Sequence, residues 1–122
     1  MPLYVDGFLL PVPKKHVDQY RRISQKAGKI WRSHGALEYR ETVGDDLKTK
    51  MGTPFTRSAK AKPNETVVFS WIVYKSRKHR DQVNKKVMKD PRMKAMMDPK
   101  KTPMPFDTKR MAYGGFEVLV DV

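Results

Sequence analysis

The sequence predicts a single α+β domain over residues 1–122, built from two βαβ units. Apolar residues recur with the spacing of a strand, then of a helix, then of a strand, and this order occurs twice. All of the net charge of +13 falls on the two predicted helical segments, 14–34 and 75–94, while the rest of the chain is balanced. Two helices lying together on one face of a four-stranded antiparallel sheet explain this partition. The order βαββαβ with that arrangement is the ferredoxin-like plan.

The first strand is expected at residues 3–10, and Pro11 and Pro13 are expected to end it. Pro13 also suits the first turn of a helix, where its missing N–H is not needed. Gly35 fits the position just past the end of that helix, where a left-handed conformation is favoured. Spacings of three and four mark the apolar face of the helix, which carries Val17, Tyr20, Ile23, Ala27, Ile30, Trp31 and His34.

The second strand is expected at residues 36–43, because Leu37, Tyr39, Glu41 and Val43 alternate with polar residues as in a half-buried strand. Residues 44–64 show no apolar period and contain Gly, Pro, Thr and Lys. This segment is long for a loop in so small a domain, so it is expected to form a lid, an arm or a mobile excursion.

The third strand, residues 66–74, is apolar on both faces and is therefore expected to be covered on both. Either Ser70 or Trp71 must face away from the helices, and the chain has no further element for that side except the 44–64 loop. The simplest cover is a second copy packed sheet against sheet. The sequence therefore predicts a symmetric homodimer through the sheet faces, a dimeric α+β barrel.

The second helix is expected to begin after Ser76, a favourable N-cap residue, and to end at Asp90-Pro91. A short helical turn with Met93, Met96 and Met97 follows, and a proline-rich loop leads to the last strand at 112–120.

Composition excludes several classes of function. The chain has no cysteine, so disulfides and thiolate chemistry are excluded. No apolar run reaches the roughly 18 residues of a membrane span, and the N-terminal residues lack the pattern of a signal peptide. A cytoplasmic protein without a membrane partner is expected. His16, His34 and His79 are not at metal-ligand spacing, and no phosphate-binding glycine loop is present, so neither a metal nor a cofactor is expected.

His34 and Asp6 are the candidate catalytic residues. His34 lies on the apolar stripe of the first helix, where an imidazole can carry protons near neutral pH, with Asp6, Glu38 or Glu41 as a neighbouring acid. The alternative is a histidine that merely ends the helix. Asp6 lies in a central strand and requires a partner if buried, which Arg40, Arg110 or His34 could supply; the alternative is a solvated carboxylate at a strand end.

A pocket between sheet and helices is expected to be lined by the ligand-binding candidates Trp31, Arg40, Trp71 and Tyr74, with Arg40 as an anion contact and the aromatic rings as walls. The alternative for the aromatic residues is an ordinary core.

Four blocks of the sequence, 4–8, 31–39, 68–76 and 104–111, resemble the YbaA-like family of small bacterial proteins. The resemblance covers almost the whole chain. It implies the fold of the dimeric α+β barrel group, which also contains antibiotic-biosynthesis monooxygenase-like proteins. The family is a domain of unknown function and implies no catalytic residues, so the resemblance adds little on activity.

The leading hypothesis is a small-molecule-binding homodimer, with cofactor-independent monooxygenase-like or isomerase-like turnover left open. The alternative is a basic interaction protein that contacts nucleic acid or an acidic partner non-specifically through its helix faces. The RNA-recognition mechanism is rejected, because the third strand lacks the required motif and the charge lies on the helices rather than the sheet. The residues assigned to the alternative are Arg21, Arg22, Lys26, Arg77, Arg80, Lys85 and Lys86.

Overall fold

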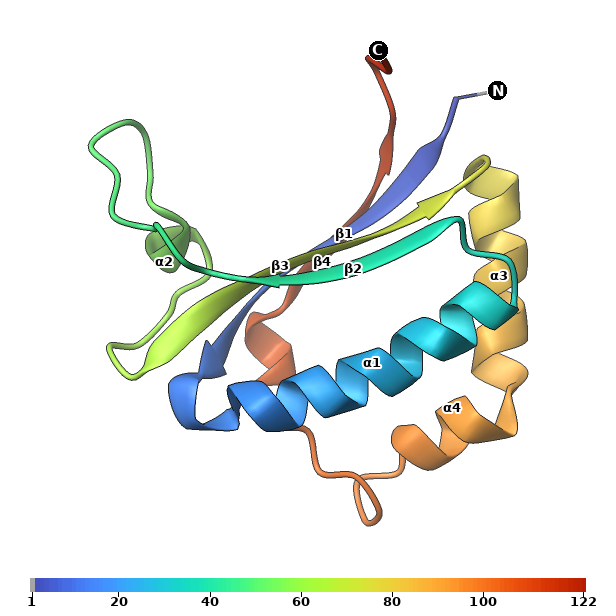
Figure 1. The fold of residues 1–122 in the computed structure, drawn as a ribbon, viewed down its shortest axis with the longest axis horizontal. Coiled ribbons are helices and arrows are strands. Elements are labelled where there is room, and N and C mark those ends of the chain that lie inside the picture. Colours follow the sequence, from blue (N-terminus) through green and yellow to red (C-terminus); the bar gives the residue numbers. More distant parts are fainter. Residues whose placement is uncertain (1) are drawn as a thin grey trace.

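The computed structural model describes residues 2–122 and contains one antiparallel sheet with the strand order β2-β3-β1-β4 (Figure 1). Helices α1, α3 and α4 all lie on one side of this sheet, and the other face is left open. The predicted α+β, ferredoxin-like fold class is therefore confirmed.

The strands are β1 (Tyr4–Pro13), β2 (Glu38–Val43), β3 (Glu65–Tyr74) and β4 (Ala112–Glu117). The helices are α1 (Val17–Ser33), α2 (Phe55–Ser58), α3 (Arg77–Lys89) and α4 (Pro91–Met96), with short 3-10 turns at η1 (Lys14–His16) and η2 (Thr108–Arg110).

Strand β1 is longer than predicted, because it continues through both prolines to Pro13. The Lys14 N–H donates to the Asn64 carbonyl at 3.0 Å, so the even-numbered residues of β1 direct their N–H groups toward β3. Pro11 and Pro13 therefore face the β4 side, where pairing stops at Leu9. A missing N–H removes no hydrogen bond at that unpaired edge, which is why the prolines do not end the strand.

Helix α1 ends as the sequence predicts. Gly35 follows the C-cap residue His34 and has a φ of +112°, in the region that favours glycine. Gly28 lets β2 approach the helix closely, since a Cβ there would lie 2.7 Å from the Tyr39 ring. The space between α1 and β2 therefore depends on this small residue.

The two faces of β3 have different environments. Val68, Ser70 and Ile72 are buried on the helix side, in the core that also contains Tyr74. Phe69 and Trp71 point to the open face, where their rings meet edge to face at 5.7 Å. The sequence left open whether Ser70 or Trp71 faces away from the helices, and in the structure it is Trp71.

The segment 44–64 carries the short helix α2 and projects at one end of the sheet toward the open side (Figure 1). Its Phe55 ring contacts Phe69 edge to face at 6.0 Å. The segment is therefore an arm beside the open face. Strand β4 ends at Glu117 rather than at residue 120, since its pairing with β1 ends at Tyr4.

The break between α3 and α4 follows the predicted signals. The Ser76 hydroxyl accepts the His79 N–H and caps α3, while the Asp90 carboxylate accepts the Arg92 N–H and caps α4. Pro91 occupies the first turn of α4. After α4 the chain crosses beneath α1, and Arg110 secures it by two 2.7 Å bonds to the Glu65 carboxylate.

Candidate functional site

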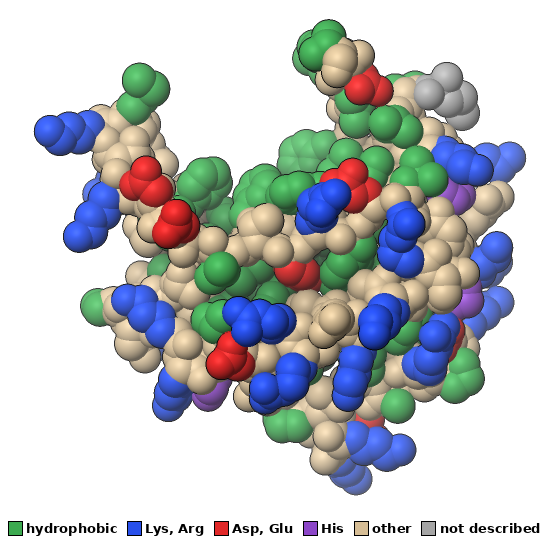
Figure 2. Space-filling model, viewed as in Figure 1, with side chains coloured by type: hydrophobic (Ala, Val, Ile, Leu, Met, Phe, Trp, Pro, Cys, Tyr) green, Lys and Arg blue, Asp and Glu red, His purple; other side chains and the backbone are tan. Residues whose placement is uncertain are grey.

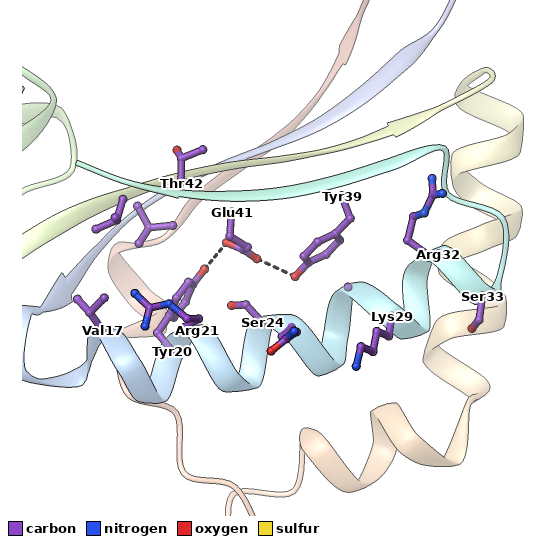
Figure 3. A pocket seen from close by; sticks show the side chains of 14 residues that line it. Val17, Tyr20, Arg21, Ser24, Lys29, Arg32, Ser33, Tyr39, Glu41 and Thr42 are labelled. Atoms are coloured by element: carbon purple, nitrogen blue, oxygen red, sulfur yellow. Dashed lines mark hydrogen bonds between the residues drawn. The ribbon is translucent and has the colours of Figure 1, made fainter. Parts of the chain in front are cut away.

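The candidate site is an open cavity of about 800 Å³ between α1 and β2, which we call the outer cavity. Figure 3 shows its floor, where α1 supplies Tyr20 and Ser24 and β2 supplies Tyr39 and Glu41. Val17, Val43 and Val68 add apolar surface at one end. The site is therefore a largely apolar hollow with one carboxylate on its floor.

Glu41 is held by two phenols. The Tyr20 hydroxyl donates to Glu41 Oε1 at 2.7 Å, and the Tyr39 hydroxyl donates to Glu41 Oε2 at 2.7 Å (Figure 3). Burial and the neighbouring carboxylate raise the pKa of both tyrosines, so both remain protonated donors. A carboxylate has about four acceptor positions, so Glu41 has capacity left for a bound molecule. It can accept a hydrogen bond or a proton from that molecule.

Three cationic side chains of α1 lie along one side of the outer cavity. Arg21, Lys29 and Arg32 all line it (Figure 3). Arg21 pairs with Asp18 at 2.6 Å, and Arg32 donates to the carbonyl groups of Ala36 and Leu37. The rim therefore places positive charge beside an apolar hollow, which favours a ligand with an anionic group.

A second cavity of about 200 Å³ lies among the sheet, α1, α4 and the segment that follows α4. We call it the methionine cavity, because Met93, Met96, Met97, Met104 and Met111 line it. Four residues line both cavities, namely Tyr20, Ser24, Tyr39 and Glu41. The Tyr20–Glu41–Tyr39 bridge is thus the place where the two cavities meet.

His34 lies at a helix junction. Its Nε2 atom is 2.7 Å from Asp90 Oδ2, and Asp90 also pairs with Arg92 at 2.8 Å. Arg92 and His34 together hold the pKa of Asp90 well below its usual range. The neighbouring acid is therefore Asp90 and not Asp6, Glu38 or Glu41 as expected, because the α3–α4 break places Asp90 at the end of α1. A proton-carrying role for His34 stays a prediction.

Asp6 is buried, at 1% exposure, and pairs with Arg80 at 2.9 Å. The predicted partners Arg40, Arg110 and His34 are therefore wrong. The physical reason is that α3 packs over the helix side of β1, which brings Arg80 to Asp6. Arg80 also donates to the Tyr113 hydroxyl at 3.0 Å and lies over the Tyr4 ring, 5.0 Å from its centroid.

Three of the four ligand-binding candidates, Trp31, Arg40 and Trp71, line the methionine cavity, and Tyr74 does not. Trp31 and Tyr74 lie on the helix side, where both donate to Asn84 Oδ1, at 3.1 and 3.2 Å.

Arg40 and Trp71 instead face the open side, where both donate to Glu38 Oε1, at 2.7 and 3.1 Å. Side chains alternate along a strand, so Trp71 and Tyr74, three residues apart, face opposite sides. A ligand-binding role for the four residues stays a prediction.

The residues on the floor of the outer cavity were not combined in the sequence prediction. Tyr39 and Glu41 share a parity in the second strand, and Tyr20 lies on the apolar stripe of the first helix. Packing the apolar face of the first helix against the side of the second strand that carries Tyr39 and Glu41 would have indicated the Tyr20–Glu41–Tyr39 bridge. A carboxylate on the inward side of a strand was the available signal.

The open face of the sheet carries an apolar groove of about 770 Å³. Phe69 and Phe116 are exposed there, at 46% and 62%, beside the partly buried Trp71. Figure 2 shows hydrophobic side chains gathered between the two projecting ends of the molecule, while Lys and Arg side chains spread over the helices. The groove is lined by Val5, Gly7, Phe8, Leu9, Phe69, Trp71, Ala112, Tyr113, Gly114, Phe116, Glu117 and Val118.

The basic helix faces are exposed except at one position. Arg80 is 13% exposed and committed to Asp6, so it does not belong to the basic surface assigned to it. Contact with nucleic acid or an acidic partner through the remaining residues stays a prediction. Within residues 2–122, no helix has the length and apolar character needed to cross a membrane, and no three histidine or acidic side chains are grouped as metal ligands.

These features define a ferredoxin-like α+β protein with a carboxylate-bearing cavity beside its first helix. Residues 3–108 match the family described as "Protein of unknown function (DUF1428)". The chain belongs to this family.

The uncharacterized protein YbaA of Escherichia coli strain K12 is 46% identical over 118 residues, covering 97% of both chains, and YbaA of Shigella flexneri matches equally. The predicted resemblance is confirmed.

Two solved structures share the fold. An uncharacterized NIPSNAP domain protein from Burkholderia xenovorans superimposes with a TM-score of 0.54 at 17% identity, covering 93% of this chain and 91% of that one. A dimeric ferredoxin-like protein from an uncultured marine organism gives a TM-score of 0.60 at 12% identity, with full coverage of both chains. At these identities the likeness establishes the fold alone.

Proposed function

We propose that this protein is a homodimer that binds a small organic molecule in the outer cavity, with Glu41 as the polar anchor. The observation that carries the proposal is the Tyr20–Glu41–Tyr39 bridge, a carboxylate held by two 2.7 Å hydrogen bonds on the floor of a largely apolar cavity. A pocket with a large apolar lining and a few convergent polar groups is typical of ligand sites.

The bridge also supports a chemical role. The two phenols fix both carboxylate oxygens, so Glu41 is pre-oriented and needs no rearrangement to accept a proton. Isomerase-like turnover requires such a base, and the cationic rim of Arg21, Lys29 and Arg32 favours an anionic substrate. Of the reaction types left open by the sequence, cofactor-independent proton transfer fits this arrangement best.

Two features support the dimer. The open face carries an apolar groove in which Phe69 and Phe116 are exposed beside the partly buried Trp71, and apolar surface gathered in this way is typical of protein–protein contacts. The charge lies on the opposite, helical side, so two copies meeting sheet to sheet keep their basic faces apart. A solved structure with the same fold is described as dimeric.

Native mass spectrometry of protein purified directly from cells tests both halves of the proposal. We expect twice the protomer mass plus a discrete small mass for each protomer. Glu41→Gln keeps the shape of the side chain and removes its charge, so it should lose the small mass and remain dimeric. Asp46→Asn is the matched control, because Asp46 is exposed and lines neither cavity.

A monomer would refute the sheet-to-sheet dimer. A dimer that carries no small mass, or a Glu41→Gln variant that retains it fully, would refute the role of Glu41.

A further inference from the structure

The methionine cavity is a separate space with its own chemistry. Its inner wall is formed by buried or partly buried residues of the sheet and α1, among them Leu10, Ile72, Ala27 and Trp31. Five methionines from α4 and the following segment line the other side together with Phe106. Met93 is buried, and Met97, Met104 and Met111 are exposed. The wall therefore combines a rigid sheet side with an adaptable methionine side.

The size of the cavity indicates what it can hold. An apolar cavity of about 150 Å³ in another protein binds benzene, so about 200 Å³ accommodates a six-membered ring with a substituent. Methionine sulfur also makes favourable contacts with aromatic rings, and its flexible side chain adjusts to their shape. Aromatic groups therefore match this lining better than polar groups do.

The polar end of the cavity is Glu41, which it shares with the outer cavity. We propose that the methionine cavity binds a benzene-sized aromatic ring whose hydroxyl group donates a hydrogen bond to Glu41. The ligand class is thus a phenol, with its ring among the methionines and its hydroxyl group at Glu41. The contact between the hydroxyl group and Glu41 rests on the proposed function, because both use Glu41 as the polar anchor. The ring site does not rest on it, since it depends on the methionine lining alone.

Methyl NMR of protein labelled at the methionine methyl groups tests this, with phenol and benzene as probes. Both probes should shift the methyl signals of the five lining residues and leave Met51 and Met88, which do not line the cavity, unchanged. Phenol should bind about ten-fold more tightly than benzene, because its hydroxyl gains a bond to a charged acceptor. Glu41→Gln should remove that advantage and leave benzene binding unchanged.

Ala27→Leu fills the cavity from α1 and should abolish the binding of both probes. Ala95→Leu is the matched control, because Ala95 is an exposed helical alanine that does not line the cavity. If Ala27→Leu unfolds, Ala27→Val adds less volume and should weaken both probes.

Unchanged methyl signals with benzene at saturation would overturn the ring site. Equal affinity of the native protein for phenol and benzene would overturn the hydroxyl assignment to Glu41. A Glu41→Gln variant that loses the mass retained from cells, while benzene never binds, would leave the proposed function standing and refute this inference. The reverse pattern, in which benzene binds at the methionines and the retained mass survives Glu41→Gln, would refute the proposed function and keep the ring site.

Discussion

Replacement of Arg80 by methionine should destabilise the fold strongly, because it leaves a buried charge without its partner. Asp6 is 1% exposed and Arg80 is 13% exposed, and their charged atoms lie 2.9 Å apart. Methionine keeps most of the apolar stem and removes the guanidinium, together with its contact over the Tyr4 ring. Breaking a buried ion pair by removing one partner costs about 3–5 kcal/mol of unfolding free energy, and we expect Arg80→Met to fall in that range.

Urea unfolding at pH 7 measures this loss. The protomer concentration is kept fixed, since the stability of the proposed homodimer would depend on it. Arg77→Met is the matched control on the same helix, because Arg77 is exposed, and it should change the unfolding free energy by about 0.5 kcal/mol or less. The double variant Asp6→Asn/Arg80→Met removes both charges and should be more stable than Arg80→Met alone.

The reasoning is refuted if Arg80→Met costs no more than Arg77→Met, or if the double variant loses the sum of the two single losses. A strong coupling between Asp6 and Arg80 would also mean that the charge of Asp6 holds α3 against the sheet. Asp6, a catalytic candidate in the sequence analysis, would then be a structural residue.

Three further predictions concern other parts of the molecule. Arg110 lowers the pKa of Glu65 to about 2 from its ordinary 4.5. The pair therefore stabilises the fold fully above pH 4.5, and this contribution is lost as the pH falls toward 2. In thermal unfolding, Glu65→Gln should lose less stability than the native protein over that pH range. Phe116→Asp places a charge in the open groove and should weaken the proposed dimer roughly 100-fold or more, as measured by analytical ultracentrifugation. Unchanged association would contradict the sheet-to-sheet arrangement. Any binding of nucleic acid through Arg22 and Lys26 should be independent of base sequence and weaken steeply with salt in fluorescence anisotropy, so tight binding at high salt would contradict it.

The fold was predictable because each of its signals is local. Gly35, Ser76 and Asp90 mark helix ends by capping chemistry that depends on a few neighbouring residues, and all three serve those roles in the structure. The apolar residues on both faces of β3 likewise predicted that the face turned away from the helices is apolar, as Phe69 and Trp71 show. The extension of β1 through its prolines was missed, because it depends on where the neighbouring strand stops.

The site was less predictable because its partners are distant along the chain. Asp6 and Arg80 are 74 residues apart, and their pairing depends on where α3 crosses the sheet. No periodicity specifies that crossing. The opposite orientations of Trp71 and Tyr74, by contrast, follow from the two-residue period of a strand, so the sequence already excluded a shared pocket for them.

The cavities themselves result from a departure from the regular ferredoxin-like plan. In a regular version of that plan, two helices of similar length cover the sheet side by side. Here α3 stops at Lys89, and Pro91 turns the chain into α4, which runs back beneath α1 (Figure 1). Part of the helix-side surface of the sheet is therefore left to flexible methionine side chains instead of a packed helix. The proline that ends α3 thus provides space beside Glu41, and the two phenols keep that carboxylate oriented within it.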